Sequence, residues 1–309
     1  MPKILITGGA GFIASCLASK LSEDQGNYVV IVDNMVTGSL EKLPSQKFAN
    51  WHFIKSDVNK FADISSVMVS YQFDYVFHYA AMVGVQRTLN NPVMVLNDIK
   101  GIRNILDLSK NTGVKCVYYS SSSEVYGESV HYPQDEETTP LNSRLPYAVV
   151  KNVGESFLKS YYQEYGLNYT IFRFFNTYGP NQSQDFVISK FLRAAIQNRD
   201  VTIFGDGMQT RTFCFIEDNI TATVNEFKAS LFKNNVVNIG SDAEISVLDL
   251  ARLIIKITGS QSKIVFLPPL KEGDMNRRRP DISRMKKLLP HDLISLEEGL
   301  RRTIESGRF

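Results

Sequence analysis

The sequence predicts a doubly wound parallel α/β sheet joined to a smaller mixed α/β lobe. The first half of the 309-residue chain alternates short apolar runs with longer amphipathic stretches, which is the order of βαβ units. Most of the runs are apolar at successive positions, as expected for parallel strands that helices cover on both faces. A glycine-rich segment directly follows the first run, so the first connection is expected to be a tight turn.

The expected strands are the short apolar runs at residues 4–6, 28–32, 51–54, 75–79, 114–119 and 169–175. Helical patterns, such as those at 12–21 and 93–109, separate neighbouring runs. This order of elements predicts a series of βαβ units in one sheet.

Beyond residue 176 the alternation loosens. Residues 185–197 and 247–258 have helical patterns, and a short strand is expected at 201–204. We interpret this part as a smaller lobe that begins near residue 175. The two predicted units cover 1–175 with roughly 213–240 added, and 176–212 with 241–309.

Composition and charge exclude several classes of protein. Lys and Arg total 34 against 32 Asp and Glu, a formal net charge of +2, which is far from the basic excess of a nucleic-acid-binding protein. No apolar run reaches the length of about 18 residues of a membrane span, and glycine-rich sequence follows the N-terminus too soon for a signal peptide. The cysteines, Cys16, Cys116 and Cys214, fit neither a disulfide framework nor a zinc site, and the four histidines lack metal-ligand spacing. We expect a cytoplasmic protein without a metal, nucleic acid or membrane partner.

The segment after the first strand has the spacing of a phosphate-binding turn. It runs Gly8-x-x-Gly11-x-x-Ala14 into a helical stretch, and glycines let backbone N–H groups at a helix N-terminus approach a pyrophosphate. Asp33 ends the second strand, where a carboxylate can bind an adenosine ribose and would repel a 2′-phosphate. The pattern predicts a Rossmann-type domain that binds NAD; the motif by itself also fits a turn without a ligand.

Tyr147 and Lys151 stand four residues apart on a predicted helix, so their side chains share one face. A phenol has a reference pKa near 10, and lowering it by about three units requires about 4 kcal/mol of preferential phenolate stabilisation. A lysine ammonium and a positive nicotinamide ring would supply it. Taken alone, the pair fits an ordinary amphipathic helix better, but residues 120–124 form a polar cluster at the end of a buried strand. Ligands of open α/β sheets bind at that edge.

These motifs, taken together and in this order, resemble the extended short-chain dehydrogenase/reductase family. The resemblance is to its nucleotide-sugar epimerases, dehydratases and decarboxylases, and it rests on residues 7–14, 120–127, 147–151, 173–180 and 205–211. It covers essentially the whole chain. It implies an NAD-binding domain in the first unit and a nucleotide-sugar-binding lobe in the second.

The resemblance also implies roles for single residues. Tyr147 would be the catalytic base, Lys151 would lower the pKa of Tyr147 and hold the nicotinamide ribose, and Ser122 would bond the reacting hydroxyl. The residues implied in NAD binding are Gly8, Gly11, Phe12, Ile13, Asp33, Asn34, Gly38, Asp57, Val58, Ala80, Ala81, Asn97, Ser120, Tyr147, Lys151 and Phe175. Those implied at the nucleotide sugar are Arg87, Ser122, Ser123, Asn176, Val187, Lys190, Arg211 and Arg278.

Different segments resemble enzymes of different reactions. Residues 83–92 and 146–148 resemble 4-epimerases, whereas 122–124 and 273–282 resemble UDP-glucuronate decarboxylases, which would place Glu124 in proton transfer and Arg278 near the sugar. Ser123 replaces the Asp of many 4,6-dehydratases. The sequence predicts a UDP-sugar 4-epimerase; the alternatives are a decarboxylase or 4,6-dehydratase using Glu124 and Arg278, and a non-catalytic NAD-binding protein. A solvated basic patch at 277–279, and local backbone bonding by Glu124, also stay open.

The helix that carries Tyr147 has apolar and aromatic residues on more than one face, namely Phe157, Leu158, Tyr161, Tyr162 and Tyr165. Packing against the sheet explains them equally well. The resemblance implies dimers formed through a four-helix bundle, so we expect a homodimer whose small-molecule partner is a UDP-sugar.

Overall fold

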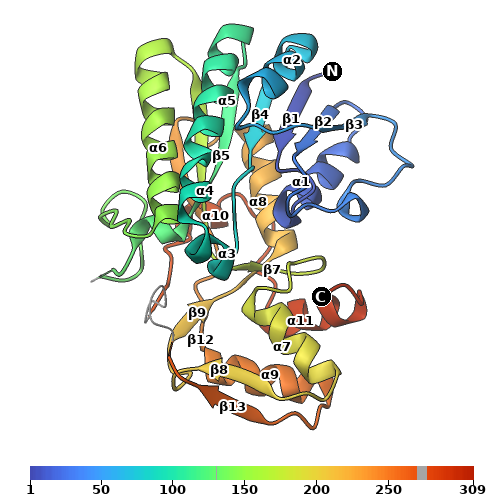
Figure 1. Ribbon diagram of the computed structural model, residues 1–309, viewed down its shortest axis with the longest axis vertical. Helices are drawn as coiled ribbons and strands as arrows, with labels where there is room; N and C mark the ends of the chain where they lie inside the picture. Colours follow the sequence, from blue (N-terminus) through green and yellow to red (C-terminus); the bar gives the residue numbers. More distant parts are fainter. Residues whose placement is uncertain (130, 270–276) are drawn as a thin grey trace.

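The computed structural model describes residues 1–129, 131–269 and 277–309, and within them a parallel sheet of seven strands forms the centre of the molecule (Figure 1). The strand order is β11-β6-β5-β4-β1-β2-β3. The six predicted strands are confirmed with small shifts at their ends. The strands are β1 (Lys3–Thr7), β2 (Tyr28–Asp33), β3 (Trp51–Lys55), β4 (Tyr75–His78), β5 (Cys116–Ser122), β6 (Asn168–Phe174) and β11 (Asn235–Ile239).

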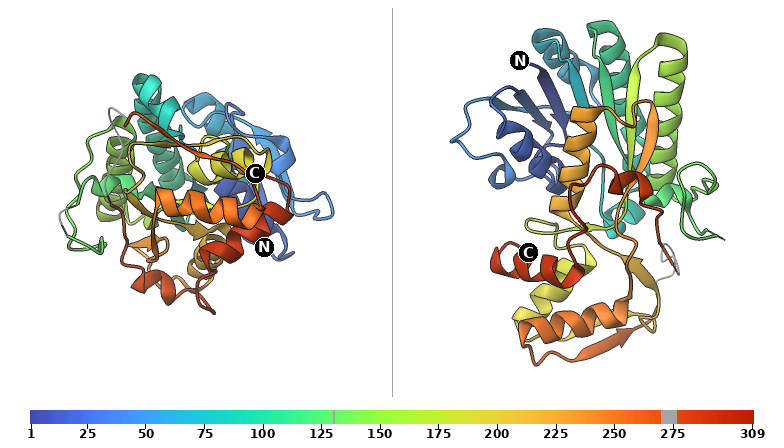
Figure 2. Two further views of the ribbon diagram at one scale, coloured as in Figure 1. Left: turned by 90° about the horizontal axis from the view of Figure 1, so that it is seen from below. Right: turned by 180° about the vertical axis from the view of Figure 1, so that it is seen from behind.

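Helices cover both faces of this sheet, as Figure 2 shows from behind. Successive residues of β1 point to opposite faces: Ile4 and Ile6 join one apolar cluster, and Leu5 joins the other. The first cluster includes α1 (Phe12–Ser22) and α8 (Ile216–Ala229), and the second includes α2 (Phe61–Tyr71), α5 (Asp98–Thr112) and α6 (Pro146–Tyr165). The sheet is therefore doubly wound, as the runs of successive apolar residues predicted.

The prediction of one helix over 93–109 is wrong in one respect, because two helices cover this stretch. α4 (Pro92–Leu96) ends before Asn97, and α5 begins at Asp98; the short α3 (Val85–Asn90) precedes them. The Asp98 carboxylate accepts hydrogen bonds from the Met82 N–H (2.7 Å) and the Asn59 side-chain amide (3.1 Å). These bonds hold the start of α5 against the carboxyl edge of the sheet, which local periodicity does not encode.

Helix α6 lies so close to β5 that its position along the sheet is closely constrained. A Cβ at Gly154 would overlap the Tyr119 hydroxyl. Deeper in the protein, Arg173 of β6 donates to both carboxylate oxygens of Glu155 of α6, at 2.9 and 2.7 Å. Both side chains are at most 2% exposed. The close packing and the buried ion pair together set where the first turns of α6 lie.

The smaller lobe is built from short elements that follow residue 176. β8 (Val201–Phe204) pairs with β13 (Ile264–Leu267), β9 (Thr210–Thr212) with β12 (Glu244–Ser246), and β7 (Thr177–Tyr178) with β10 (Cys214–Phe215). Its helices are α7 (Val187–Ile196), α9 (Val247–Thr258) and α11 (Leu296–Glu305), whereas α10 (Ser283–Lys286) packs against β11 of the central sheet. In Figure 1 this lobe lies beyond the end of the sheet where α3 and β7 are found.

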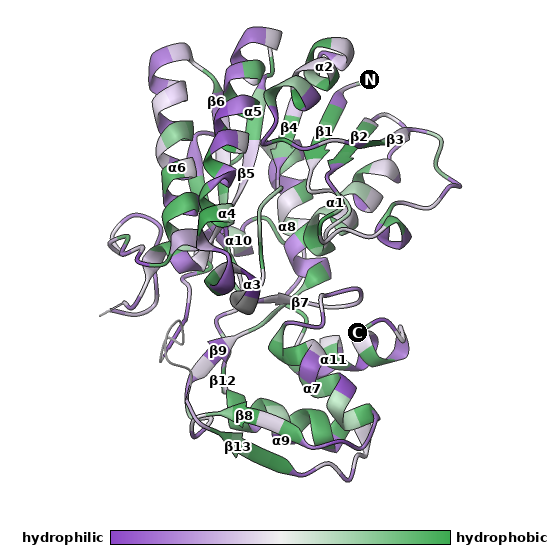
Figure 3. Cartoon of the chain, in the orientation of Figure 1, coloured by the Kyte–Doolittle hydropathy of each residue, from purple (hydrophilic) through white to green (hydrophobic). Residues whose placement is uncertain are grey.

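Apolar residues follow the sheet and the inner sides of its helices, and a second group marks β8 and β13 of the smaller lobe (Figure 3). Among the described residues, no helix combines the length and the hydropathy that crossing a membrane requires.

Candidate active site

The carboxyl ends of the parallel strands open into a cavity of about 750 Å³ that residues of both lobes line. This is the edge at which open α/β sheets bind ligands, and the volume lies in the upper part of the range of ligand sites. Most of the residues singled out from the sequence line it. The three that do not are Gly38, Lys190 and Arg211.

The phosphate-binding turn lies at one end of the cavity. Gly8 has a φ of +68°, and a Cβ there would lie 2.7 Å from the backbone of Ala80. Gly11 precedes the first turn of α1 and contributes no capping side chain. No N-cap side chain therefore occupies the N–H groups of that turn, and they can bind an anion. The turn therefore leaves a cradle for a pyrophosphate.

A buried contact joins the end of β1, directly before this turn, to the end of β4. The Thr7 hydroxyl accepts hydrogen bonds from the N–H groups of Tyr79 and Ala80, both at 3.2 Å. The hydroxyl therefore donates its own hydrogen bond to Nδ1 of His78, 2.8 Å away, and the proton of the neutral His78 ring is on Nε2. Burial lowers the pKa of His78 to about 3, and the charge of Lys151 adds to this.

His78 predicts how stability depends on pH. In the unfolded chain a histidine binds a proton below a pH of about 6.5, whereas folded His78 stays neutral down to about pH 3. The unfolded state then binds more protons, so the free energy of unfolding should fall as the pH falls through this window, by about 1.4 kcal/mol per pH unit from this residue. Urea unfolding between pH 4 and 6 measures this slope. His78→Asn should have a shallower slope, and equal slopes in the two proteins would contradict the assignment.

The part of the cavity next to this turn has the features of an adenosine site. Asp33 accepts hydrogen bonds from the N–H groups of Ala10 (3.0 Å) and Met35 (2.8 Å). Gly38 packs behind it, because a Cβ there would lie 2.9 Å from the Asp33 carboxylate. Gly38 thus supports Asp33 without lining the cavity. Other predicted residues at this end that do line it are Asn34, Asp57 and Val58.

Tyr147 and Lys151 lie at the start of α6, where Pro146 occupies the first turn. The Lys151 ammonium donates to the Ser120 carbonyl oxygen at 2.5 Å and to the Ser120 hydroxyl at 3.3 Å. It lies 5.7 Å from the centre of the Tyr147 ring. Burial lowers the pKa of Lys151 to about 8, and the carboxylate of Asp98 opposes this shift. Lys151 therefore remains mostly protonated at neutral pH.

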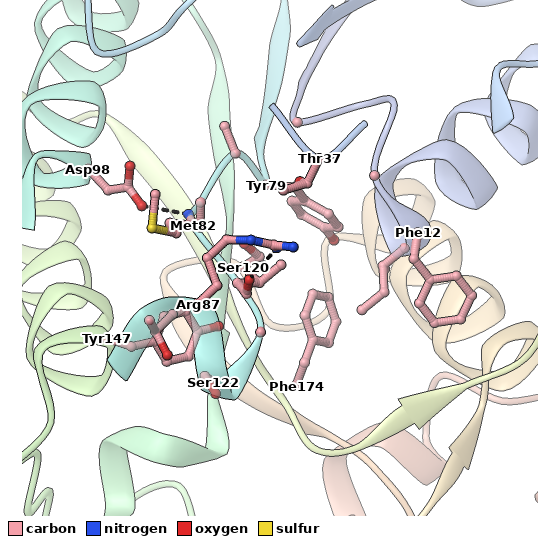
Figure 4. A pocket seen from close by; sticks show the side chains of 18 of the residues that line it. Phe12, Thr37, Tyr79, Met82, Arg87, Asp98, Ser120, Ser122, Tyr147 and Phe174 are labelled. Carbon is pink, nitrogen blue, oxygen red and sulfur yellow. Dashed lines mark hydrogen bonds between the residues drawn. The ribbon is translucent and has the colours of Figure 1, made fainter. Parts of the chain in front are cut away.

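The Tyr147 hydroxyl lies beside Ser122 (Figure 4). Burial raises the pKa of Tyr147, the charge of Glu124 raises it further, and a hydrogen bond with Ser122 opposes the increase. The residue is consequently protonated in the protein alone. A positive charge brought next to the ring would be required to make it a base at neutral pH.

Glu124 and Arg278 form a second polar group near Tyr147. Arg278, which is 7% exposed, donates to a Glu124 carboxylate oxygen at 2.7 Å. The Glu124 N–H donates to the Ser122 hydroxyl at 3.2 Å, and Ser123 also lines this part of the cavity. Arg278 is thus a buried residue of the cavity rather than part of a solvated patch. Residues 273–276 of the decarboxylase-like stretch lie outside the described residues.

The predicted substrate residues divide into two groups. Arg87, Asn176 and Val187 line the cavity; Arg87 pairs with Asp185 at 3.4 Å. Lys190 points to the exposed side of α7, and the Arg211 guanidinium donates to the Thr210 carbonyl oxygen at 2.7 Å. The structure therefore does not bring Lys190 and Arg211 to the cavity.

Several lining residues were missed by the sequence interpretation. They are Thr37, Lys42, Tyr79, Met82, Asp98, Phe174, Gln182 and Phe213. In Figure 4 Tyr79 and Phe174 lie between Phe12 and Tyr147, and Met82 lies beside Asp98. Tyr79 directly follows β4, and Asp98 directly follows the predicted site residue Asn97. Their positions next to these features could have identified them as lining residues.

The residues present fit NAD. The Gly8 cradle, the uncapped start of α1 and the Asp33 carboxylate lie along one cavity with Tyr147 and Lys151. Gly8, Gly11 and Phe12 would hold the pyrophosphate, Asp33 the adenosine ribose, and Lys151 the nicotinamide ribose.

Comparison with known proteins identifies relatives that span both lobes. Residues 4–240 match the model of the NAD dependent epimerase/dehydratase family. The chain is 36% identical over 308 residues to a putative UDP-glucose 4-epimerase of Methanocaldococcus jannaschii, with 97% of each chain covered. It is 33% identical over 312 residues to UDP-glucuronic acid decarboxylase 1 of Danio rerio, covering 98% of this chain and 72% of that protein. A UDP-glucose 4-epimerase of Thermotoga maritima with UDP-glucose superposes with a TM-score of 0.91, at 33% identity and 98% and 97% coverage.

Proposed function

Because the chain belongs to the NAD-dependent epimerase/dehydratase family, we propose that it is a UDP-sugar 4-epimerase that works through a transient 4-keto sugar. The general reaction class follows from the family. The choice of epimerisation is supported by the Glu124–Arg278 pair beside Tyr147.

The side chains that line the cavity suit each proton movement of this reaction. NAD, when bound, would accept a hydride from C4 of the sugar and return it to the other face. Tyr147 takes the proton of the 4-hydroxyl group and gives it back, while Ser122 bonds the same oxygen. Lys151, held by Ser120, favours the phenolate of Tyr147 through its charge. The keto sugar must turn to present its other face, and a cavity of about 750 Å³ that two lobes line gives it room.

The Glu124–Arg278 pair favours a neutral sugar. The guanidinium of Arg278 and the carboxylate of Glu124 neutralise each other at 2.7 Å. A uronic acid would bring a second carboxylate next to Glu124, and like charges in a partly buried site repel. A hexose offers hydroxyl groups that can bond to both members of the pair. This is the observation that carries the choice of an epimerase.

A UDP-uronate decarboxylase is the second candidate, and the acid–base group of Glu124, rather than its ion pair with Arg278, supports it. C4 epimerisation needs one acid–base group, which Tyr147 supplies, and Glu124 would be a second acid–base group without a required proton transfer. Loss of CO₂ from a 4-keto uronate leaves a carbanion equivalent that must be protonated. Glu124 lines the cavity near Tyr147 and is able to deliver that proton.

A panel of substrates tests the proposal. The purified protein is incubated with UDP-glucose, UDP-N-acetylglucosamine and UDP-glucuronate, and the products are identified by NMR. We expect the C4 epimer of a neutral UDP-sugar with no change in mass. Release of CO₂ with formation of a UDP-pentose would replace the epimerase with the decarboxylase. Absence of conversion of every sugar would favour a non-catalytic NAD-binding protein.

Glu124→Gln separates the two reactions further. The amide keeps an oxygen that can accept from Arg278 but removes the titrating group. An epimerase should keep its kcat within about tenfold, whereas loss of a required proton donor lowers kcat by about a hundredfold or more. Glu137→Gln is the matched control, because Glu137 pairs with Arg284 outside the cavity. A hundredfold loss of epimerase activity in Glu124→Gln, with Glu137→Gln unaffected, would contradict the neutral-pair argument.

We also propose that the protein is a homodimer through the face formed by α4, α5 and α6. These helices lie side by side in Figure 1, and exposed apolar groups are found on α4 and at the C-terminal end of α6. Val93 is 73% exposed, Met94 50% and Tyr165 48%. Burying such groups favours association. Light scattering should give twice the mass of the chain, and the mass of one chain would contradict the proposal.

A further inference from the structure

The turn η2 (Ser123–Tyr126) is joined to the segment of Arg278 at two places, although 155 positions separate Ser123 from Arg278. The first connection is the Glu124–Arg278 ion pair in the cavity. The second is buried: the Tyr126 hydroxyl donates to the side-chain oxygen of Asn238 at 2.8 Å. The amide nitrogen of Asn238 in turn donates to the Asp281 carbonyl oxygen at 3.2 Å. Glu124 and Tyr126 thus connect one turn to both sides of the same segment.

Asn238 supports a short backbone pairing between Gln134 and the residues that follow Arg278. Its side-chain nitrogen also donates to the carbonyl oxygen of Gln134 at 3.0 Å. The Gln134 N–H donates to the Arg279 carbonyl oxygen (2.7 Å), and the Asp281 N–H donates to the Gln134 carbonyl oxygen (2.8 Å). The backbone on both sides of Pro280 is therefore fixed to Gln134, and Asn238 contacts both strands of this bridge.

Tyr126 is itself held from the opposite side. Its hydroxyl accepts a hydrogen bond from Arg173 at 2.8 Å, and Arg173 is the partner of Glu155 in α6. Burial raises the pKa of Tyr126 to about 12, so its proton remains available for Asn238. A chain of buried polar groups therefore runs from the helix of Tyr147 to the backbone beside Arg278.

Regular secondary structure does not position Arg278. Residues 277–279 belong to no helix or strand, yet the Arg278 side chain is only 7% exposed. Ordering a long arginine side chain costs conformational entropy of up to about 2 kcal/mol. A binding group must also be held within about half an ångström of its working position by the residues behind it. Tyr126 and Asn238 do not line the cavity. Their buried hydrogen bonds can therefore support the Arg278 segment from behind.

We propose that Tyr126 and Asn238 form a latch that positions Arg278 against Glu124 at the sugar end of the cavity. This inference rests on the proposed function, in which Arg278 contacts the sugar. Tyr126 is a positioning residue: its hydroxyl touches neither cofactor nor substrate and acts on turnover through Arg278.

Hydrogen exchange tests the latch without reference to activity. Tyr126→Phe removes only the hydroxyl, and the amides of Gln134 and Asp281 should then exchange at least tenfold faster, with the amides of α1 unchanged. Tyr118→Phe is the matched control; Tyr118 is a buried tyrosine of β5 whose hydroxyl faces Cys116. Unchanged exchange at Gln134 and Asp281 in Tyr126→Phe would overturn the proposal. Asn238→Ser interrupts the same link and takes its place if Tyr126→Phe does not fold.

A double-variant comparison tests the route to turnover. Tyr126→Phe should lower kcat/KM about tenfold in the otherwise natural protein and less than twofold in a protein that carries Arg278→Gln, with the Kd of NAD unchanged in both. Equal losses in the two backgrounds would show that Tyr126 has a general structural role and would overturn the positioning role. If the natural protein converts no nucleotide sugar, the proposed function fails, and the exchange experiment still decides whether the latch exists.

Discussion

Tyr147→Phe should reduce turnover of the UDP-sugar by about a hundredfold to ten-thousandfold and leave NAD bound. The substitution removes the only group at this position that can exchange a proton with the substrate hydroxyl. It keeps the ring, which lines the cavity 5.7 Å from the Lys151 ammonium. The measurements are kcat from NMR of the product and the NAD content of the purified protein.

Tyr161→Phe is the control for this experiment. Tyr161 is on the same helix, but its hydroxyl donates to Asp107 at 2.8 Å and lies outside the cavity. It should keep kcat within about twofold. A Tyr147→Phe protein with the turnover of the natural chain would remove Tyr147 from the role of base. Loss of NAD together with activity would point to a binding role.

Glu155→Gln should lower the free energy of unfolding by about 3–5 kcal/mol, because it leaves the Arg173 guanidinium buried without its counter-charge. Arg173 is 2% exposed, so water cannot replace the lost carboxylate. The same change affects Ser121, whose hydroxyl donates to Glu155 at 2.5 Å. Urea unfolding followed by circular dichroism measures the effect.

Two further variants serve as a control and as a rescue for the Glu155→Gln result. Glu297→Gln breaks the exposed pair with Arg301 and should shift the melting temperature by about 1 °C or less. Combining Glu155→Leu with Arg173→Met removes both charges and should recover part of the loss, because two uncharged side chains carry no desolvation penalty. A stability equal to that of the natural chain in Glu155→Gln would show that the pair is not essential to the core.

The strands and the phosphate-binding turn were predictable because their signals are local. A short run of successive apolar residues bounded by turn signals is typical of a strand covered on both faces. Gly8 needs a positive φ and close approach to Ala80, and only glycine meets both conditions at low strain. The spacing of Tyr147 and Lys151 similarly places them on one face of any helix.

The remaining features depend on contacts between distant segments. The start of α5 is held by the bonds of the Asp98 carboxylate to the Met82 N–H and the Asn59 side-chain amide, which come from distant segments. Lys190 lies within a segment that reaches the cavity through Val187, but its own side chain faces outward, because neighbouring positions of a helix point in different directions. A motif therefore identified the right helix without identifying each lining residue.

The sequence by itself determined the sheet, the cofactor turn, the Tyr147–Lys151 pair and the family to which they belong. Short-range periodicity and fixed spacings carry that information. Only the tertiary structure decided that Arg278 leaves the solvent to pair with Glu124, and that Tyr126 and Asn238 hold it there. The reason is physical: the charged run at 277–279 has the same local pattern whether it is solvated or buried. Burial of Arg278 is favourable only where the fold supplies a carboxylate from a segment distant in the sequence and hydrogen bonds that hold the backbone beside it.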